Sequence, residues 1–203
     1  CLTCSGRASS GTGRCATLAR AWILGCFHRR SRSRRLRRVS DASLDSMLSR
    51  EWLETNGLGS YASGTTSGAA TRRYHGLLVA ALEPPTRRHV LLSRVDDEIV
   101  VGGMPFPLCT NVYRDVVYPE GYRSIDHFEA RPVATWLFRA GGVEVERRVW
   151  MPQGRQTTVI TYRIRAGRGS GGEVKLSLRP MVSFRSFHAL SSEREGIDAA
   201  MAV

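Results

Sequence analysis

The side chains best suited to contact a ligand are concentrated between residues 52 and 78. Amide, phenol, guanidinium and imidazole groups alternate there with small residues. Five glycines lie among them: Gly57, Gly59, Gly64, Gly68 and Gly76. Glycine loses more entropy on folding than other residues, but it permits tight turns and close backbone approach, and polar loops on a rigid scaffold often carry binding groups. We interpret the stretch as a shaped binding surface, and a set of tight turns leading into a strand is the alternative.

Three groups of acidic residues were compared with the needs of glycoside hydrolysis, which uses two carboxylates across the scissile bond. Glu144 and Glu146 alternate with valines, which is typical of the solvated face of a strand. The acidic run at 96–98 is interpreted as a turn or a strand end. The third group is Asp126 with Glu129, and the pair Asp126-His127 is assigned no role. The residues by themselves therefore give no persuasive catalytic pair of carboxylates.

Other reactive side chains give little support for a catalytic or metal site. His75 could hydrogen-bond a ligand, but a lone histidine is more often structural. Cys109 is interpreted as a buried core thiol. Cys1 and Cys4 form a Cys-x-x-Cys pair without a matching second pair, so no zinc site is expected. The chain also lacks a phosphate-binding loop, a dinucleotide fingerprint and a nucleophile elbow, and we expect no cofactor.

Strand patterns dominate the chain after residue 76. A continuous apolar run at 77–82 ends before two prolines, and residues 143–149 alternate between valines and charged side chains. Further strands are predicted at the following ranges: 90–93, 99–101, 135–139, 157–165 and 173–179. Gly102-Gly103 and the segment 140–142 are typical hairpin turns, and 167–172 is interpreted as a flexible turn. Short strands joined by short turns predict an all-β fold, an antiparallel β-sandwich or barrel.

The first fifty residues have a different composition from the remainder. They carry eleven arginines against two aspartates, a net charge of +9, while residues 51–203 carry nineteen basic and sixteen acidic side chains. We expect residues 1–40, which are rich in Arg, Ser and Cys, to be a disordered tail. A short amphipathic helix is predicted over about residues 41–50, where Leu44, Met47 and Leu48 share one face.

The sequence blocks at 50–64 (REWLETNGLGSYASG) and 71–78 (TRRYHGLL) resemble one family closely. It is the N-terminal domain of the bacterial and archaeal type of glycogen debranching enzyme, an amylo-α-1,6-glucosidase. Shorter matching blocks follow at 90–93, 119–123, 157–159, 178–180 and 184–188. Ser60 stands where a glycine would be expected, and residues 1–38 have no counterpart. The resemblance covers residues 41–203.

The resemblance implies a large antiparallel β-sandwich, called a super-sandwich, that precedes an (α/α)6 catalytic barrel. In such enzymes the acid and base carboxylates lie in the barrel, and this chain ends before one begins. The resemblance therefore implies a non-catalytic domain at 41–203, inactive alone, that packs on the barrel and helps shape the cleft for glycogen or another branched α-glucan. Glycogen catabolism and a single cysteine in the domain favour the cytoplasm.

The same resemblance implies roles for the polar stretch. Trp52, Tyr61 and Tyr74 are expected to stack on pyranose faces, whereas amide, guanidinium and imidazole groups bond to sugar hydroxyls. Sealing the interface with the barrel is the equal alternative. The candidate residues for either role are Asn56, Gly57, Tyr61, Arg72, Arg73, Tyr74 and His75.

Two other functional classes stay open. One is a stand-alone carbohydrate-binding module, and the other is an RNA-associated protein that uses the arginine-rich run at 29–38. That run has no interleaved aromatic residues to stack on bases, so nucleic-acid binding is not favoured. No segment has the length and apolarity of a membrane span, and the apolar run at 16–27 is followed, not preceded, by its arginines.

Overall fold

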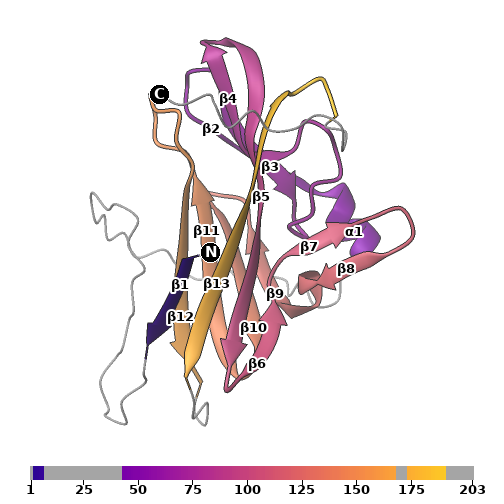
Figure 1. Cartoon of the computed structure of the whole chain (residues 1–203), viewed down its shortest axis with the longest axis vertical. Helices are drawn as coiled ribbons and strands as arrows, with labels where there is room; N and C mark the ends of the chain where they lie inside the picture. The colour runs from indigo at the N-terminus through magenta and orange to yellow at the C-terminus, as the bar shows by residue number, and fades with distance from the viewer. Residues whose placement is uncertain (1, 7–42, 168–172, 191–203) are drawn as a thin grey trace.

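The computed structural model describes residues 2–6, 43–167 and 173–190. Antiparallel strands dominate these residues, and two sheets pack around a shared hydrophobic core (Figure 1). The prediction of an all-β antiparallel sandwich is confirmed. None of the helices in the described ranges is long and apolar enough to cross a membrane.

The larger sheet has seven strands in the order β1-β13-β5-β4-β3-β2, with β6 paired to β5. Its members are β1 (Leu2–Gly6), β2 (Glu51–Thr55), β3 (Tyr61–Thr65), β4 (Gly76–Glu83), β5 (Thr86–Val101), β6 (Met104–Pro107) and β13 (Val174–Ser186). The smaller sheet has the order β12-β11-β10-β9. Its members are β9 (Ile125–Glu129), β10 (Ala134–Ala140), β11 (Val143–Trp150) and β12 (Val159–Ala166).

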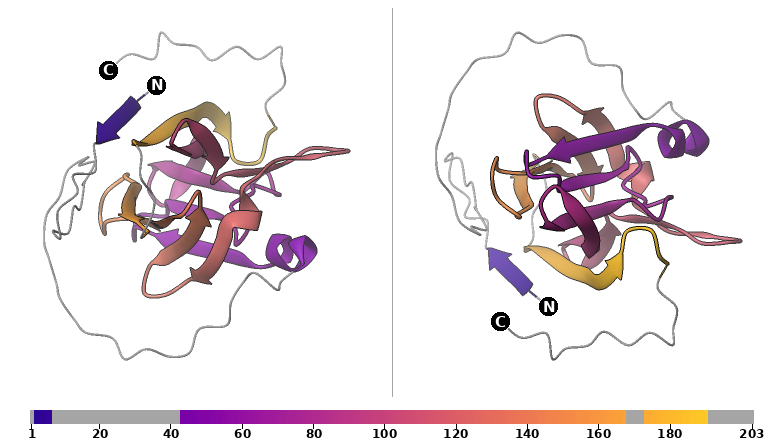
Figure 2. Two further views of the ribbon diagram at one scale, coloured as in Figure 1. Left: turned by 90° about the horizontal axis from the view of Figure 1, so that it is seen from below. Right: turned by 90° about the horizontal axis from the view of Figure 1, so that it is seen from above.

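A two-stranded hairpin projects from the side of the sandwich (Figure 2). It consists of β7 (Thr110–Val112) and β8 (Val117–Glu120), and the 3-10 helix η2 (Gly121–Ser124) follows it. The two predicted glycine turns are also present: Gly102-Gly103 joins β5 to β6, and Gly141-Gly142 joins β10 to β11. All four glycines have positive φ, as the tight hairpin turns of twisted strands require.

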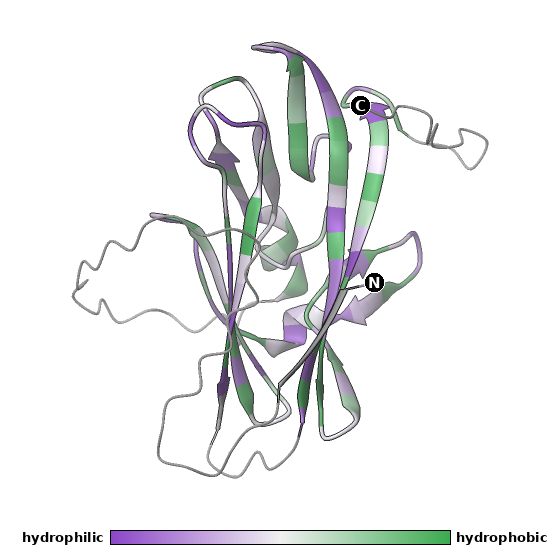
Figure 3. Cartoon of the chain, turned by 60° about the vertical axis from the view of Figure 1, so that its left-hand side comes forward, coloured by the Kyte–Doolittle hydropathy of each residue, from purple (hydrophilic) through white to green (hydrophobic). Residues whose placement is uncertain are grey.

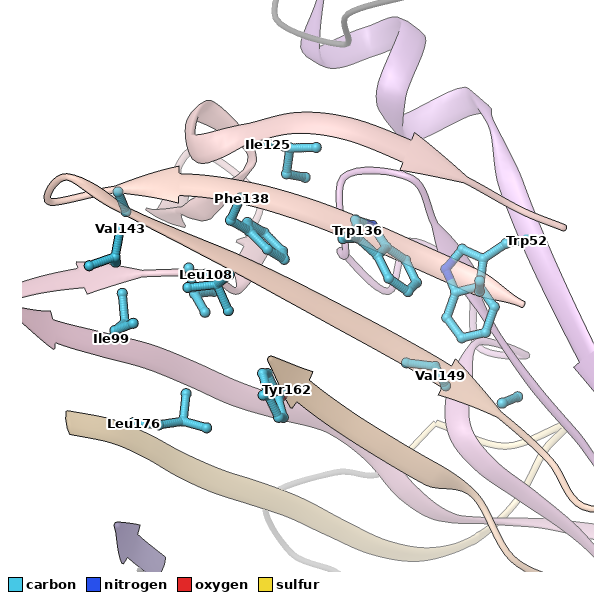
Figure 4. Close-up of a cluster of buried hydrophobic side chains, with 14 of the residues drawn as sticks. Trp52, Ile99, Leu108, Ile125, Trp136, Phe138, Val143, Val149, Tyr162 and Leu176 are labelled. Atoms are coloured by element: carbon cyan, nitrogen blue, oxygen red, sulfur yellow. The ribbon is translucent and has the colours of Figure 1, made fainter. Parts of the chain in front are cut away.

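Alternating side chains explain why these strands form a sandwich. In β11 the side chains of Val143, Val145 and Val149 are buried, whereas the glutamates between them lie on the outer face. Hydropathy alternates along the strands in the same way (Figure 3). Trp136 and Phe138 of β10 contribute the largest buried side chains of the core (Figure 4). The apolar inner faces are thereby removed from water, which is the main stabilising contribution to the fold.

The helix preceding the sandwich is shorter than predicted. α1 spans Leu44–Ser49, and its N-cap is Ser43, whose hydroxyl accepts a hydrogen bond from the Ser46 amide at 3.3 Å. Met47 is buried on its inner side.

Leu2–Gly6, which lie within the segment expected to be a disordered tail, form β1 against β13. A strand can add to a sheet edge through backbone hydrogen bonds alone, which composition does not reveal. Residues 7–42 and the predicted turn at 168–172 lie outside the described residues.

Two strands are longer than their sequence patterns indicated. The acidic run at 96–98 was expected to end a strand, but it lies within β5, which is continuous over sixteen residues. β13 continues through Pro180, which cannot donate a ladder hydrogen bond. Its pairing with β1 stops at Leu178, so Pro180 occupies a position where that edge of β13 has no described neighbour.

Candidate functional site

The glycine-rich stretch forms β2, β3 and the loops that join them to β4. Asn56 is fully buried in the β2–β3 turn. Its Oδ1 accepts hydrogen bonds from the amides of Leu58 at 2.9 Å and Ser60 at 3.2 Å, and its Nδ2 donates to the carbonyl of Arg155 at 2.8 Å. Asn56 therefore holds the turn together from inside, as asparagine commonly does in turns. Gly57 follows it at the surface with a φ of 77°.

His75 has a similar internal role in the loop before β4. Its side chain is buried, and Nδ1 accepts hydrogen bonds from the amides of Thr71 at 3.1 Å and Arg72 at 3.3 Å. The proton of the neutral ring therefore lies on Nε2, which is 3.4 Å from Glu51 Oε1. Burial lowers the pKa of His75, against the opposing effect of the Glu51 carboxylate. Glu51 also pairs with the exposed Arg72 at 2.7 Å.

The remaining candidates lie at the surface, where they meet the end of β13. The Tyr74 ring lies 5.3 Å from that of Phe187 and 5.8 Å from that of His188. Arg73 is stacked over the Tyr74 ring at 5.4 Å and donates to the carbonyl of His188 at 3.1 Å. We call the group formed by Tyr61, Arg73, Tyr74, Arg185, Phe187 and His188 the Tyr74 cluster.

Two further contacts fix the backbone beneath the Tyr74 cluster. The Tyr61 hydroxyl donates to the carbonyl of Tyr74 at 2.9 Å, and Arg185 Nη2 donates to the carbonyl of Arg73 at 2.8 Å. Burial raises the pKa of Tyr61 and lowers that of Arg185, although both keep their usual charge at neutral pH. The cluster thus presents an aromatic ring and a guanidinium on a rigid base, which suits contact with a pyranose face and its hydroxyls.

The structure divides the sequence-predicted residues into two groups. Tyr61, Arg73 and Tyr74 belong to one cluster, and Arg72 is exposed beside it, whereas the polar atoms of Asn56 and His75 serve the loops from inside. The expected stacking role of Trp52 is wrong, because its ring is buried in the core at 5.2 Å from Trp136. A tryptophan on the inner face of an edge strand packs into the core, because burying its large apolar area is favourable.

Sequence reasoning missed the partners that β13 supplies to the cluster. Arg185, Phe187 and His188 stand in one of the short blocks that resemble the debranching family. That block was the available signal. Its residues lie more than a hundred positions after Tyr74 in the chain, and the pairing of β13 with β5 brings them close to it.

A buried ion pair inside the sandwich was also missed. Asp97 Oδ2 accepts hydrogen bonds from Arg147 Nη1 and from the Tyr162 hydroxyl, both at 2.9 Å. The Arg147 guanidinium stacks over the rings of Trp136 and Phe138 at 4.5 and 5.1 Å. Burial and the neighbouring Asp97 charge raise the pKa of Tyr162 well above its ordinary value. The signal was Arg147 itself, because the alternation of β11 places it on the inner face with the valines.

Three of the acidic residues considered for catalysis, Glu144, Glu146 and Asp126, are paired with arginines. Glu144 lies 3.0 Å from Arg165 and Glu146 lies 3.2 Å from Arg148. Asp126 lies 3.2 Å from Arg139. Cys109 is buried as predicted, and burial together with the charges of Asp97 and Asp96 raises its pKa to about 12. Across the described ranges, histidine, cysteine and acidic side chains form no group of three that could hold a metal ion.

Comparison with known proteins identifies the family of this chain. The family model for the glycogen debranching enzyme N-terminal domain matches residues 50–202. The match contains the Tyr74 cluster and all strands from β2 onward. Neither the search of curated proteins nor the search of solved structures gave a match. Because the family model covers well over half of the sequence, this chain belongs to the family of glycogen debranching enzyme N-terminal domains.

Proposed function

We propose that this chain is the non-catalytic β-sandwich part of a cytoplasmic enzyme that hydrolyses α-1,6-glucosidic branches in glycogen or limit dextrin. Its role is to help shape the glucan cleft and to pack against an (α/α)6 catalytic domain. The observation that carries the proposal is the Tyr74 cluster, which lies within the residues that match the family model. A guanidinium stacked on an exposed tyrosine offers both contacts that a glucan chain needs.

The arrangement of the cluster favours a ligand role over a purely structural one. More than a third of the Tyr74 surface is exposed, although the rings of Phe187 and His188 and the guanidinium of Arg73 lie against it. Its backbone is held by Tyr61 and Arg185, so the ring is positioned without being covered. Preorganised aromatic side chains bind with a smaller entropic cost than mobile ones.

The test is affinity electrophoresis of the 203-residue chain in gels containing glycogen. We expect glycogen to retard the wild-type chain, and Arg73→Ala and Tyr74→Ala to remove most of that retardation. Arg163→Ala is the matched control, because Arg163 is an exposed arginine on β12 in the other sheet. Circular dichroism establishes that each variant is folded.

Either of two results would reject the ligand role of the cluster. One is a wild-type chain that glycogen does not retard, which would leave the cluster as a contact surface for the catalytic domain. The other is equal retardation of wild type and both cluster variants, which would place glucan binding elsewhere on the domain.

A further inference from the structure

A hollow lies on the outer face of the larger sheet, beside the β7–β8 hairpin. Its floor is formed by Asp96 and Glu98 of β5 with Arg179 of β13, and its wall by Asn111, Tyr113 and Tyr118 of the hairpin. The hollow has a volume of about 580 Å³, which falls within the range of roughly 300–1,000 Å³ found for ligand pockets. These six residues are called the hairpin groove.

Strand alternation explains why polar side chains gather on the floor. Asp97 points into the core toward Arg147, so Asp96 and Glu98 on either side of it point outward. Arg179 is the cross-strand partner of Asp96 and lies 3.9 Å from Glu98. Asp96 and Glu98 of the acidic run, which the sequence suggested to be a turn or a strand end, thus form part of the floor of an open groove.

The hairpin contributes two tyrosines whose side chains are largely exposed to solvent. Tyr118 is 71% exposed and Tyr113 is 52% exposed. Among the described residues, neither hydroxyl has a hydrogen-bond partner. Asn111 stands two residues before Tyr113 on the same face, and its Nδ2 donates to Asp96 Oδ1 at 3.2 Å. Arg94 donates to the same oxygen at 3.0 Å, so the floor carboxylate is held in place.

The composition of the groove indicates the class of ligand. Planar carboxylate, amide and guanidinium groups bond to hydroxyls, and tyrosine rings pack against apolar ring faces. The acidic floor opposes a polyanion such as RNA, although the chain as a whole is basic with a net charge of +12. A neutral polymer that carries many hydroxyls and has apolar ring faces fits both the acidic, polar floor and the tyrosine wall.

We propose that the hairpin groove is a second glucan-binding site, which holds an α-1,4-linked segment of the branched substrate at a distance from the Tyr74 cluster. The ligand class rests on the proposed function, whereas the position of the site rests on the groove itself. The two sites lie at different places along β13, because the cluster joins the loop before β4 to the end of β13, whereas the groove joins the middle of β13 to the hairpin.

The experiment titrates the 203-residue chain with maltoheptaose, an unbranched α-1,4-glucan, in a calorimeter. We expect Tyr118→Ala to weaken binding about tenfold, the loss of one favourable aromatic contact. Tyr118→Phe keeps the ring and is expected to restore most of the affinity. Val116→Ala is the matched control, because Val116 is an exposed apolar residue of the same hairpin that does not line the groove.

The variants separate this inference from the proposed function. Maltoheptaose affinity that Tyr118→Ala reduces and Tyr74→Ala leaves unchanged supports a separate groove site. Affinity that only Tyr74→Ala reduces overturns the groove and leaves the proposed function standing. Equal affinity of wild type, Tyr118→Ala and Val116→Ala also overturns it, as does a wild-type chain that takes up no maltoheptaose at millimolar concentration.

Discussion

Asp97 shows how a single buried charge ties the two sheets together. It lies on β5 of the larger sheet, and its partners Arg147 and Tyr162 lie on β11 and β12 of the smaller one. All three side chains are buried. Removing one member of a buried ion pair leaves the other charge without compensation in a region of low dielectric, which is more damaging than replacing both.

We therefore expect Asp97→Ala to lower the free energy of unfolding by about 3–5 kcal/mol. Urea denaturation measures this as a fall in the midpoint at constant slope. Asp115→Ala is the control, because Asp115 is exposed in the hairpin loop, where surface substitutions change stability by about 0.5 kcal/mol or less. The double variant Asp97→Leu with Arg147→Met should recover much of the lost free energy of unfolding. A single-variant effect no larger than that of the control would contradict the structural role assigned to Asp97.

At the scale of elements, the hairpin that walls the groove depends on one close backbone contact. Gly121 begins η2 directly after β8, and its amide donates to the carbonyl of Cys109 at 2.9 Å. A Cβ at this glycine would lie 2.4 Å from the Cys109 oxygen and from the Leu108 carbonyl carbon. Both obstructing atoms belong to the backbone, so they cannot rotate away as a side-chain tip would.

Gly121→Ala is accordingly expected to destabilise the domain by about 1–3 kcal/mol, the usual range for overpacking. Thermal unfolding provides the measurement. Gly154→Ala is the comparison, since Gly154 has a φ of 70° but nothing within 4 Å of its added Cβ; its cost is limited to about 1–2 kcal/mol of backbone strain. The steric argument fails if Gly121→Ala unfolds at the wild-type temperature.

The strands themselves were largely predictable, because burial of one face imposes alternation directly on the sequence. In β11 the valines identify the inner face without any knowledge of the partner sheet. β5 was not predictable over its full length, because three consecutive acidic residues locally indicate a turn. The inward Asp97 is compensated by Arg147, fifty residues later in the chain, and by Tyr162. Long-range pairing of this kind leaves no local pattern.

The candidate site was predictable only in part, for the same reason. Tyr74 and Arg73 were identified from residue type and spacing, and they do lie at the surface. His75 and Asn56 carry the same kinds of polar group, but the loops close over them. Whether a polar side chain points to solvent or bonds to its own loop depends on backbone geometry, which composition does not determine.

At the scale of the whole molecule, the carboxylates of the hairpin groove are engaged by other polar side chains. The hairpin groove contains carboxylates, but Asp96 bonds to Arg94 and Asn111, and Glu98 lies near Arg179. Glu120 at its edge is held by two hydrogen bonds from Arg123, which lower its pKa. A glycosidase requires one carboxylic acid with a raised pKa to protonate the leaving oxygen. Arginine pairing works against that requirement.

We therefore expect the 203-residue chain to bind glucan without releasing glucose from a limit dextrin. The measurement is a coupled glucose assay over several hours at high protein concentration. A catalytically competent debranching enzyme treated in parallel shows that the substrate is cleavable. Glucose release by this chain that Glu98→Gln abolishes would contradict the assignment and would make the hairpin groove itself catalytic. Arg123→Gln removes the hydrogen bonds that lower the pKa of Glu120. We still expect no turnover from that variant, because glycoside hydrolysis also needs a second carboxylate placed across the scissile bond.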